Sequence, residues 1–170
     1  MTECLDIVND NDEVVGKSSY NEMYEKKLTH RIVHVLVVNN KGQVYFQKRA
    51  ETKSFLPGYY CTSAGGHVRS GESYEQAAGR ELKEELGLSV PVKDVASLEF
   101  ESGGHKRFIR LFIASADSGF NFQDGEVAGG EFLNLAEAKK LIERNEKIHP
   151  QLPLCFGWLY ENLGSLSIHS

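Results

Sequence analysis

Apolar and polar positions alternate in some stretches of the chain and recur every three or four residues in others, which separates predicted strands from predicted helices. Alternating or β-branched stretches predict strands at residues 5–8, 14–16, 32–38, 44–49, 90–100, 107–116 and 131–133. Helical spacing and capping residues predict helices at residues 18–27, 73–87, 135–145 and 153–163, the first of them capped by Ser18 or Ser19.

The turns between these segments indicate how the strands are connected. The Asn39–Gly42 turn joins two predicted strands, so residues 31–49 are expected to form a β-hairpin. Gly103 and Gly104 join the next two predicted strands in the same way, whereas residues 51–63 have the composition of a loop. Interleaved strands and helices predict one domain of α/β or α+β class, with a sheet between helical layers.

Composition and charge limit the classes of function. A chain of 170 residues, 41% hydrophobic and 25% charged, is long enough for one domain with a core. Its net charge of -5 argues against a nucleic-acid partner, and an anionic substrate would require a cation in its site. No signal peptide or membrane span is visible, and Cys4, Cys61 and Cys155 have no metal-binding spacing. We therefore expect a cytoplasmic protein with no membrane partner.

The helix predicted at 73–87 places three carboxylates on one face. Glu81, Glu84 and Glu85 stand at i, i+3 and i+4, where like charges repel one another and oppose the helix dipole. A hard divalent cation bound by the carboxylate oxygens would offset both the repulsion and the unfavourable interaction with the dipole. The same face carries Tyr74, Ala77 and Ala78.

A solvated, glutamate-rich surface helix is the alternative explanation of this pattern. Glu72 would then be a first-turn residue favoured by the helix dipole, and Arg80 would pair with Glu84 at i+4. The small apolar residues on the acidic face, a turn at Gly65-Gly66 before the helix and Glu72 at its N-terminal end favour a metal site instead.

Residues 66–88 resemble the Nudix box, Gly-x5-Glu-x7-Arg-Glu-U-x-Glu-Glu-x-Gly-U, at every fixed position, where U is a bulky aliphatic residue. The resemblance implies an α/β/α sandwich in which the box forms a loop–helix–loop on a mixed sheet. It also implies hydrolysis of a nucleoside diphosphate derivative or a related small-molecule diphosphate with Mg²⁺ or Mn²⁺. We expect residues 1–170 to form one such domain, with residues 1–28 as an N-terminal extension packed on it.

The resemblance assigns roles to individual residues of the box. Glu84 and Glu85 become the main metal ligands, and Glu81 becomes a ligand or the base for the attacking water. The carbonyl of Gly65 completes the coordination.

Other residues receive supporting roles from the same resemblance. Arg80 and Glu72 are expected to orient the carboxylates. Glu126 occupies a place resembling the family's additional base or metal ligand, with Phe132 as the aromatic residue that follows it; a loop-surface glutamate is the alternative. Substrate contacts are predicted for His67, Arg49 and Lys53, and the last two are equally explained as ordinary surface charge. The family also admits a homodimer, although no interface is visible in the sequence.

A second resemblance, to the isopentenyl-diphosphate isomerase branch of the superfamily, changes the reaction class. It is carried by residues 28–30, 40–43, 47–49, 53–58 and 66–67. This branch moves a double bond and uses a cysteine just before the Gly-His pair, together with a separate metal site of histidines and glutamates.

The chain departs from the isomerase pattern at several of these positions. Gly65 stands where the cysteine belongs, and Cys61 lies four residues too early. His30 and His67 match two of the histidines, whereas the first histidine falls near Met23. We therefore predict a Nudix hydrolase, with an isomerase-like activity as the enzyme alternative and a non-catalytic nucleotide sensor as the alternative from another class.

Overall fold

The computed structural model describes residues 3–166 of the chain. Its helices are α1 (Tyr20–Glu25), α2 (Tyr74–Leu86), α3 (Leu135–Arg144) and α4 (Leu152–Asn162), followed by a 3-10 turn at Leu163–Ser165. Its strands are β1 (Cys4–Val8), β2 (Val14–Ser19), β3 (His30–Val38), β4 (Val44–Arg49), β5 (Tyr60–Cys61), β6 (Ala64–His67), β7 (Val92–Ser102), β8 (His105–Ser115) and β9 (Val127–Leu133). Within residues 3–166, every helix is too short or too polar to cross a membrane.

Strand β3 is the centre of a mixed sheet. It pairs in parallel with β8 along its whole length and antiparallel with β6, and β8 continues antiparallel to β7. The next strand, β4, touches β3 only at the Val38–Val44 pair and then pairs with β9 and β5. The two groups of strands therefore diverge from the Asn39–Gly42 turn.

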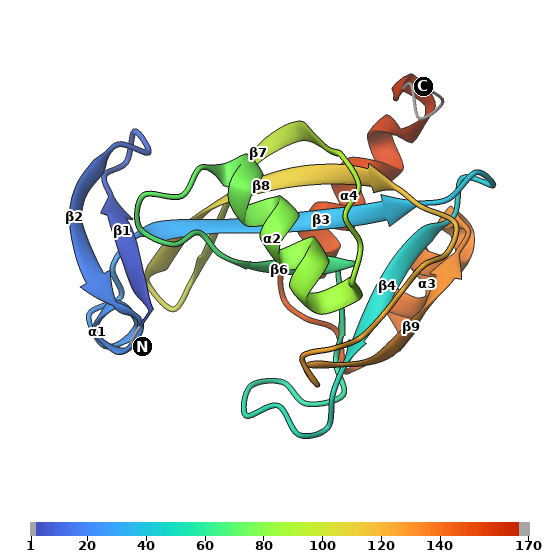
Figure 1. Cartoon of the computed structure of the whole chain (residues 1–170), viewed down its shortest axis with the longest axis horizontal. Helices are drawn as coiled ribbons and strands as arrows, with labels where there is room; N and C mark the ends of the chain where they lie inside the picture. The colour runs from blue at the N-terminus through green and yellow to red at the C-terminus, as the bar shows by residue number, and fades with distance from the viewer. Residues whose placement is uncertain (1–2, 167–170) are drawn as a thin grey trace.

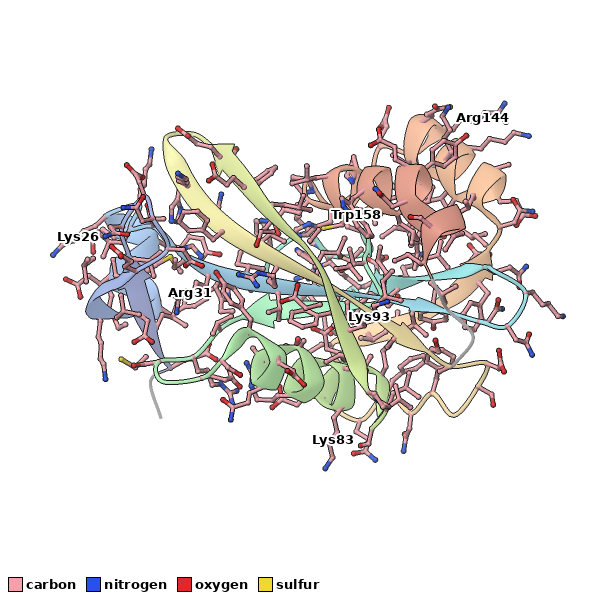
Figure 2. The ribbon with its side chains drawn as sticks, turned by 90° about the horizontal axis from the view of Figure 1, so that it is seen from above. Lys26, Arg31, Lys83, Lys93, Arg144 and Trp158 are labelled. Atoms are coloured by element: carbon pink, nitrogen blue, oxygen red, sulfur yellow. The ribbon has the colours of Figure 1, made fainter. Side chains whose placement is uncertain are left out.

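Helices cover both faces of this sheet (Figures 1 and 2). On one face α2 packs Ala77, Ala78 and Leu82 against the valines of β3. On the other face α3 and α4 pack against the alternate residues of β3, β4 and β8. The α/β/α sandwich is thus confirmed, because β3 carries apolar side chains toward both helical layers.

Helix α2 begins and ends where the sequence predicts. The Ser73 hydroxyl accepts a hydrogen bond from the Gln76 amide, and the Ser73 amide donates one to Gln76 Oε1, which completes a capping box. Gly87 ends the helix at a positive φ of 69°, a conformation that glycine adopts without steric cost. Lys83 points away from the sheet (Figure 2), so the opposite face of the helix carries the acidic residues of the box.

Strands β1 and β2 and helix α1 form a small N-terminal unit at the beginning of β3 (Figure 1). Leu5, Ile7 and Met23 form its buried centre. The Val8 amide donates to the Thr29 carbonyl, and the Ser70 amide donates to the Cys4 carbonyl. The second of these hydrogen bonds ties the unit to the loop that leads into α2.

Two predictions of local structure need correction. The hairpin expected at 31–49 is wrong in its extent, because β6 and β8 already occupy the two edges of β3 and β4 finds other partners. The residues around Gly65-Gly66 form a strand, β6, although glycine is a poor strand former. Pairing with β3 supplies the hydrogen bonds that make this segment extended.

Candidate active site

Glu81 lies directly over the backbone of β6. A Cβ atom added to Gly66 would overlap with the Glu81 carboxylate, so only a glycine leaves room for this side chain. The side chain of Glu81 is 13% exposed. The first glycine of the box therefore has a steric function in the site, and the box brings Glu81 against the strand that precedes it.

Glu85 lies one turn further along α2 and is more deeply buried, with 7% of its surface exposed. Gln47 of β4 donates a hydrogen bond to Glu85 Oε2 and a second to the Ser63 carbonyl. The Gly65 amide lies 3.4 Å from Glu85 Oε1. Glu85 is thus held between α2, β4 and β6, and its partners are neutral donors.

Arg80 connects the two ends of the box. Its Nε and Nη2 atoms donate to the two oxygens of Glu72 at 2.7 and 3.0 Å. Its Nη1 atom lies 2.6 Å from Glu81 Oε1 and 3.2 Å from Glu84 Oε2. A further bond to the His67 carbonyl joins it to β6. The structure therefore brings Glu72, Arg80, Glu81 and Glu84 together.

Burial shifts the ionisation of the two inner carboxylates. Desolvation raises the pKa of Glu81 to about 7, and the charge of Arg80 opposes this shift. Desolvation also raises the pKa of Glu85 well above its ordinary value, and the negative charge of Glu81 adds to the effect. Two buried carboxylates without enough positive charge are costly, and a bound cation would reverse both shifts.

Glu84 and Glu126 stand at the rim of the site. The side chain of Glu84 is 44% exposed and lies 3.9 Å from Arg69, while Glu126 is 49% exposed. Lys53 pairs with Glu126 at 2.9 Å. Glu126 borders the same cleft as the box glutamates, and its negative charge adds to the raised pKa of Glu85.

These residues border one cleft of about 730 Å³. Glu81, Glu84 and Glu85 line one side of it, and Arg49 at the end of β4 and Lys53 in the loop that follows also line it. Arg49 donates to the Phe55 carbonyl at 2.8 and 3.1 Å, and among residues 3–166 it has no carboxylate partner. The predicted substrate contacts Arg49, Lys53 and His67 therefore all lie in the cleft that holds the box glutamates.

Comparison with known proteins agrees with this geometry. A family model described as the NUDIX domain matches residues 28–152. The chain belongs to the Nudix family. The Nudix hydrolase YfcD of Shigella flexneri is 36% identical over 129 residues, which cover 75% of this chain and 72% of that protein.

Two further comparisons extend over more of the chain. The isopentenyl-diphosphate Δ-isomerase 2 of Photorhabdus laumondii is 31% identical over 154 residues, which cover 88% of this chain and 87% of that protein. The crystal structure of DR0079 from Deinococcus radiodurans superposes with a TM-score of 0.82 at 29% identity and covers 93% of this chain and 99% of that one. Family membership confirms the prediction of an enzyme of the Nudix pyrophosphohydrolase class, and Nudix hydrolases generally use divalent metal ions.

Two of the residues that carry the isomerase resemblance, His30 and His67, lie in one cluster with His105. The rings of His30 and His67 stack at a centroid distance of 5.2 Å, and His105 lies 5.0 Å from His30. Arg107 donates to the His105 carbonyl at 3.2 Å. Met23 is buried in the N-terminal unit instead of contributing a histidine. In the described residues this cluster contains no glutamate that hydrogen-bonds to a histidine.

The cysteine expected for an isomerase has no equivalent at the Nudix box. Gly65 lies on β6 opposite His34, and a Cβ atom there would stand 2.8 Å from His34 Nδ1, so a cysteine does not fit this geometry unchanged. Cys61 lines the cleft, but burial raises the pKa of its thiol to about 12.

The oxygen ligands of the site are of the kind that binds a divalent cation, but the carboxylates do not point to one common position. Carboxylate oxygens are the ligands that Mg²⁺ prefers. Within residues 3–166, however, no three His, Cys, Asp or Glu side chains stand in metal-binding geometry. Arg80 holds Glu81 and Glu84, and Lys53 holds Glu126. A cation at this site would therefore compete with these ion pairs.

Sequence reasoning missed several residues of the site. Gln47 shares its face of β4 with Tyr45, which packs in the core beneath α2, so strand alternation alone would have directed it toward the helix. His34 is buried, with Thr62 and Gln151 at 2.6 Å from its two ring nitrogens. Arg107 carries no local signal, because only the pairing of β8 with β3 brings it to the cleft.

Proposed function

We propose that this chain is a Mg²⁺- or Mn²⁺-dependent hydrolase that uses water to cleave the diphosphate bond of a nucleoside diphosphate derivative or a related organic diphosphate. The observation that carries the proposal is the burial of Glu81 and Glu85 side by side against Gly65-Gly66, with both pKa values raised. A structural role explains such a pair poorly, because it destabilises the fold unless a cation arrives.

In this proposal Glu84 and Glu85 are the principal metal ligands, Glu81 is a ligand or the base, and the Gly65 carbonyl adds a backbone oxygen. The bound cation supplies a water of lowered pKa and neutralises the diphosphate. Arg80, anchored by Glu72, keeps Glu81 and Glu84 on the cleft side of α2, and a bound cation would replace Arg80 as their partner. Gln47 orients Glu85 by the hydrogen bond it donates.

The cationic side chains at the end of β4 and in the loop that follows it are proposed to hold the substrate phosphates. Arg49 has donors left over after its bonds to the Phe55 carbonyl, and a guanidinium fits a phosphate bidentately. Lys53 reaches the phosphates once its pair with Glu126 opens, which also frees Glu126 to act as a base or ligand. His67, next to Gly66, is proposed as a further contact. These side chains offset the net charge of -5 at the site.

We also propose that residues 1–170 act as one domain, since the N-terminal unit and the loop before α2 share backbone hydrogen bonds. A homodimer and a cytoplasmic location stay predictions.

A substrate panel tests the proposed reaction. The protein is incubated with Mg²⁺ or Mn²⁺ and with nucleotide sugars, dinucleotides, nucleoside diphosphates and prenyl diphosphates, and phosphate-containing products are measured. We expect hydrolysis of at least one nucleoside diphosphate derivative, abolished by EDTA. Mutation of a residue that only supports a metal ligand typically lowers metal affinity or activity about 10- to 100-fold. Glu85 is proposed as a ligand itself, so Glu85→Gln should lower kcat by at least that factor. Glu75→Gln, on the exposed side of α2, is the matched control.

Other outcomes of the panel support other functions. An allylic isomer formed without phosphate release would establish an isomerase. This alternative is included because the Photorhabdus laumondii relative is named as an isopentenyl-diphosphate isomerase. Binding of nucleotides without turnover of any compound would establish a sensor. Hydrolysis at the wild-type rate by both Glu84→Gln and Glu85→Gln would refute the proposed metal ligands.

A further inference from the structure

The N-terminal unit lies outside the segment that the family model matches, yet it forms one wall of the cleft. The family match begins at residue 28, whereas Glu3, Tyr20 and Tyr24 all line the cleft together with the box glutamates. The glutamates alone do not determine what the cleft can hold, so this wall is where the moiety attached to the diphosphate can be selected.

The position of the two tyrosines is set by the packing of α1. Met23, fully buried with Leu5 and Ile7, anchors the helix, and Ser19 caps its first turn. Tyr20 and Tyr24 are one turn apart and therefore share a face. They are 39% and 38% exposed, so the anchor of the helix is Met23 and the two rings stay available in the cleft.

The tyrosine rings meet the strand that carries Gly66. Tyr20 lies edge-on to the ring of His67 at 5.1 Å, and the Tyr24 hydroxyl is 3.3 Å from His67 Nε2. The Tyr20 and Tyr24 rings are 4.8 Å apart at an angle of 56°. His67 follows Gly65 by two residues, which corresponds to about 7 Å along a strand. This leaves room for a short linker, such as a ribose, between the diphosphate and the aromatic wall.

Arg107 adds hydrogen-bond donors on the side of the cleft formed by β7 and β8. Its guanidinium lies 5.8 Å from the centre of the Phe100 ring, and both residues line the cleft. Its side-chain hydrogen bonds within residues 3–166 go to His105, so it has no carboxylate partner there. A ligand at this end of the cleft meets aromatic faces and an uncompensated guanidinium.

We infer that Tyr20, Tyr24, His67 and Arg107 form a subsite for a planar heteroaromatic ring attached to the substrate diphosphate, with the two tyrosines as specificity-determining residues. Such a ring offers a π face to the tyrosines and ring nitrogens or carbonyl oxygens to Arg107. A saturated or isoprenoid chain would offer the Arg107 guanidinium no acceptor in place of the water that it displaces, which is costly. The inference rests on the proposed function for its diphosphate, but it concerns ring binding only.

Equilibrium binding without metal tests the subsite separately from catalysis. Calorimetry in EDTA compares adenosine and uridine 5′-monophosphates with ribose 5-phosphate, which lacks the ring, on the full chain. We expect the wild type to bind the nucleotides about 5- to 150-fold more tightly than ribose 5-phosphate, the range for stacking of a base on an aromatic side chain. In Tyr20→Leu and in Tyr24→Leu the affinity ratio of nucleotide to ribose 5-phosphate should fall close to one, while Tyr20→Phe and Tyr24→Phe should keep the wild-type ratio.

Controls keep the result interpretable. Tyr160→Leu removes a tyrosine of similar exposure (46%) that does not line the cleft, and it should leave the ratio unchanged. In the wild type, base protons should show nuclear Overhauser contacts to tyrosine ring protons, a measurement that needs no variant. Equal affinity for ribose 5-phosphate and the nucleotides, or an unchanged ratio in both leucine variants, would overturn the inference. Failure of hydrolysis in the substrate panel would instead overturn the proposed function and leave these binding results standing.

Discussion

At the scale of single residues, the Glu81 carboxylate occupies the space that a side chain at Gly66 would fill, and the glycine leaves that space open. Helical spacing was enough to predict that Glu81, Glu84 and Glu85 share a face. Spacing does not predict their unequal burial, which arises because β6 lies against Glu81 and Glu85 and leaves Glu84 at the rim. The partner of Glu85, Gln47, comes from a distant strand.

Gly66→Ala should therefore damage the site more than the fold. The new methyl group overlaps with the Glu81 carboxylate, so Glu81 has to turn away, and we expect hydrolysis to fall about tenfold or more, as for other misplaced catalytic groups. Gly79→Ala is the matched control, because a Cβ atom there meets no atom within 4 Å. It should raise stability by up to about 1 kcal/mol through helix propensity. Steady-state kinetics and thermal denaturation measure both effects, and equal activity of the two variants would contradict the steric argument.

The raised pKa of Glu81 predicts a pH dependence for the metal-free protein. Its folded value of about 7 exceeds the ordinary value of 4.5, so its protonation stabilises the fold at low pH and this contribution disappears as the pH rises through about 7. Relative to Glu81→Gln, the wild type should lose roughly 1 kcal/mol of unfolding free energy between about pH 6 and about pH 8.

Urea denaturation in EDTA at the two pH values measures this difference. The comparison with Glu81→Gln cancels the opposite contribution of His67 and other buried histidines, whose pKa values are lowered by desolvation. A difference that does not change with pH would show that Glu81 is ionised at neutral pH without a cation.

At the scale of elements, the helices and the hairpin of β7 and β8 were predictable, and the pairing of strands far apart in sequence was not. Ser73 and Gly87 are local signals that mark the two ends of α2. The parallel pairing of β3 with β8 joins residues far apart in sequence, and it replaced most of the hairpin expected at 31–49. The strand β6 forms only because β3 offers it hydrogen bonds, and its two glycines give no strand signal of their own.

Arg80 is the side chain that joins α2 to β6 and to the start of the box, and its removal should destabilise this element. It is 16% exposed and pairs with Glu72 and Glu81, both of them largely buried. Arg80→Ala leaves two buried carboxylates without their partner, so we expect a loss of roughly 2 to 4 kcal/mol in the free energy of unfolding without metal.

Lys83→Ala is the control for this variant. Lys83 lies on the outer face of the same helix (Figure 2), and its removal should change stability by no more than about 0.5 kcal/mol. Chemical denaturation of both variants in EDTA gives the comparison. Similar stability of Arg80→Ala and Lys83→Ala would mean that the Arg80 ion pairs contribute nothing net.

At the scale of the whole molecule, the cleft is assembled from parts that no single motif reveals. The box provides the glutamates, the end of β4 and the loop after it provide Arg49 and Lys53, and the N-terminal unit provides Tyr20 and Tyr24. The box alone was sufficient to predict the family and the sandwich. The far walls depend on long-range pairing, so the sequence could not assign them to the site.

The most direct test of the central claim is Mn²⁺ binding to the full chain, measured by the electron paramagnetic resonance signal of free Mn²⁺. The wild type and the control Glu75→Gln should remove Mn²⁺ from solution equally, whereas Glu85→Gln should bind it about tenfold more weakly or worse. Mg²⁺ should displace the bound Mn²⁺. Equal Mn²⁺ binding by Glu85→Gln and the wild type, or no binding by either, would contradict the assignment of the buried glutamates to a metal site.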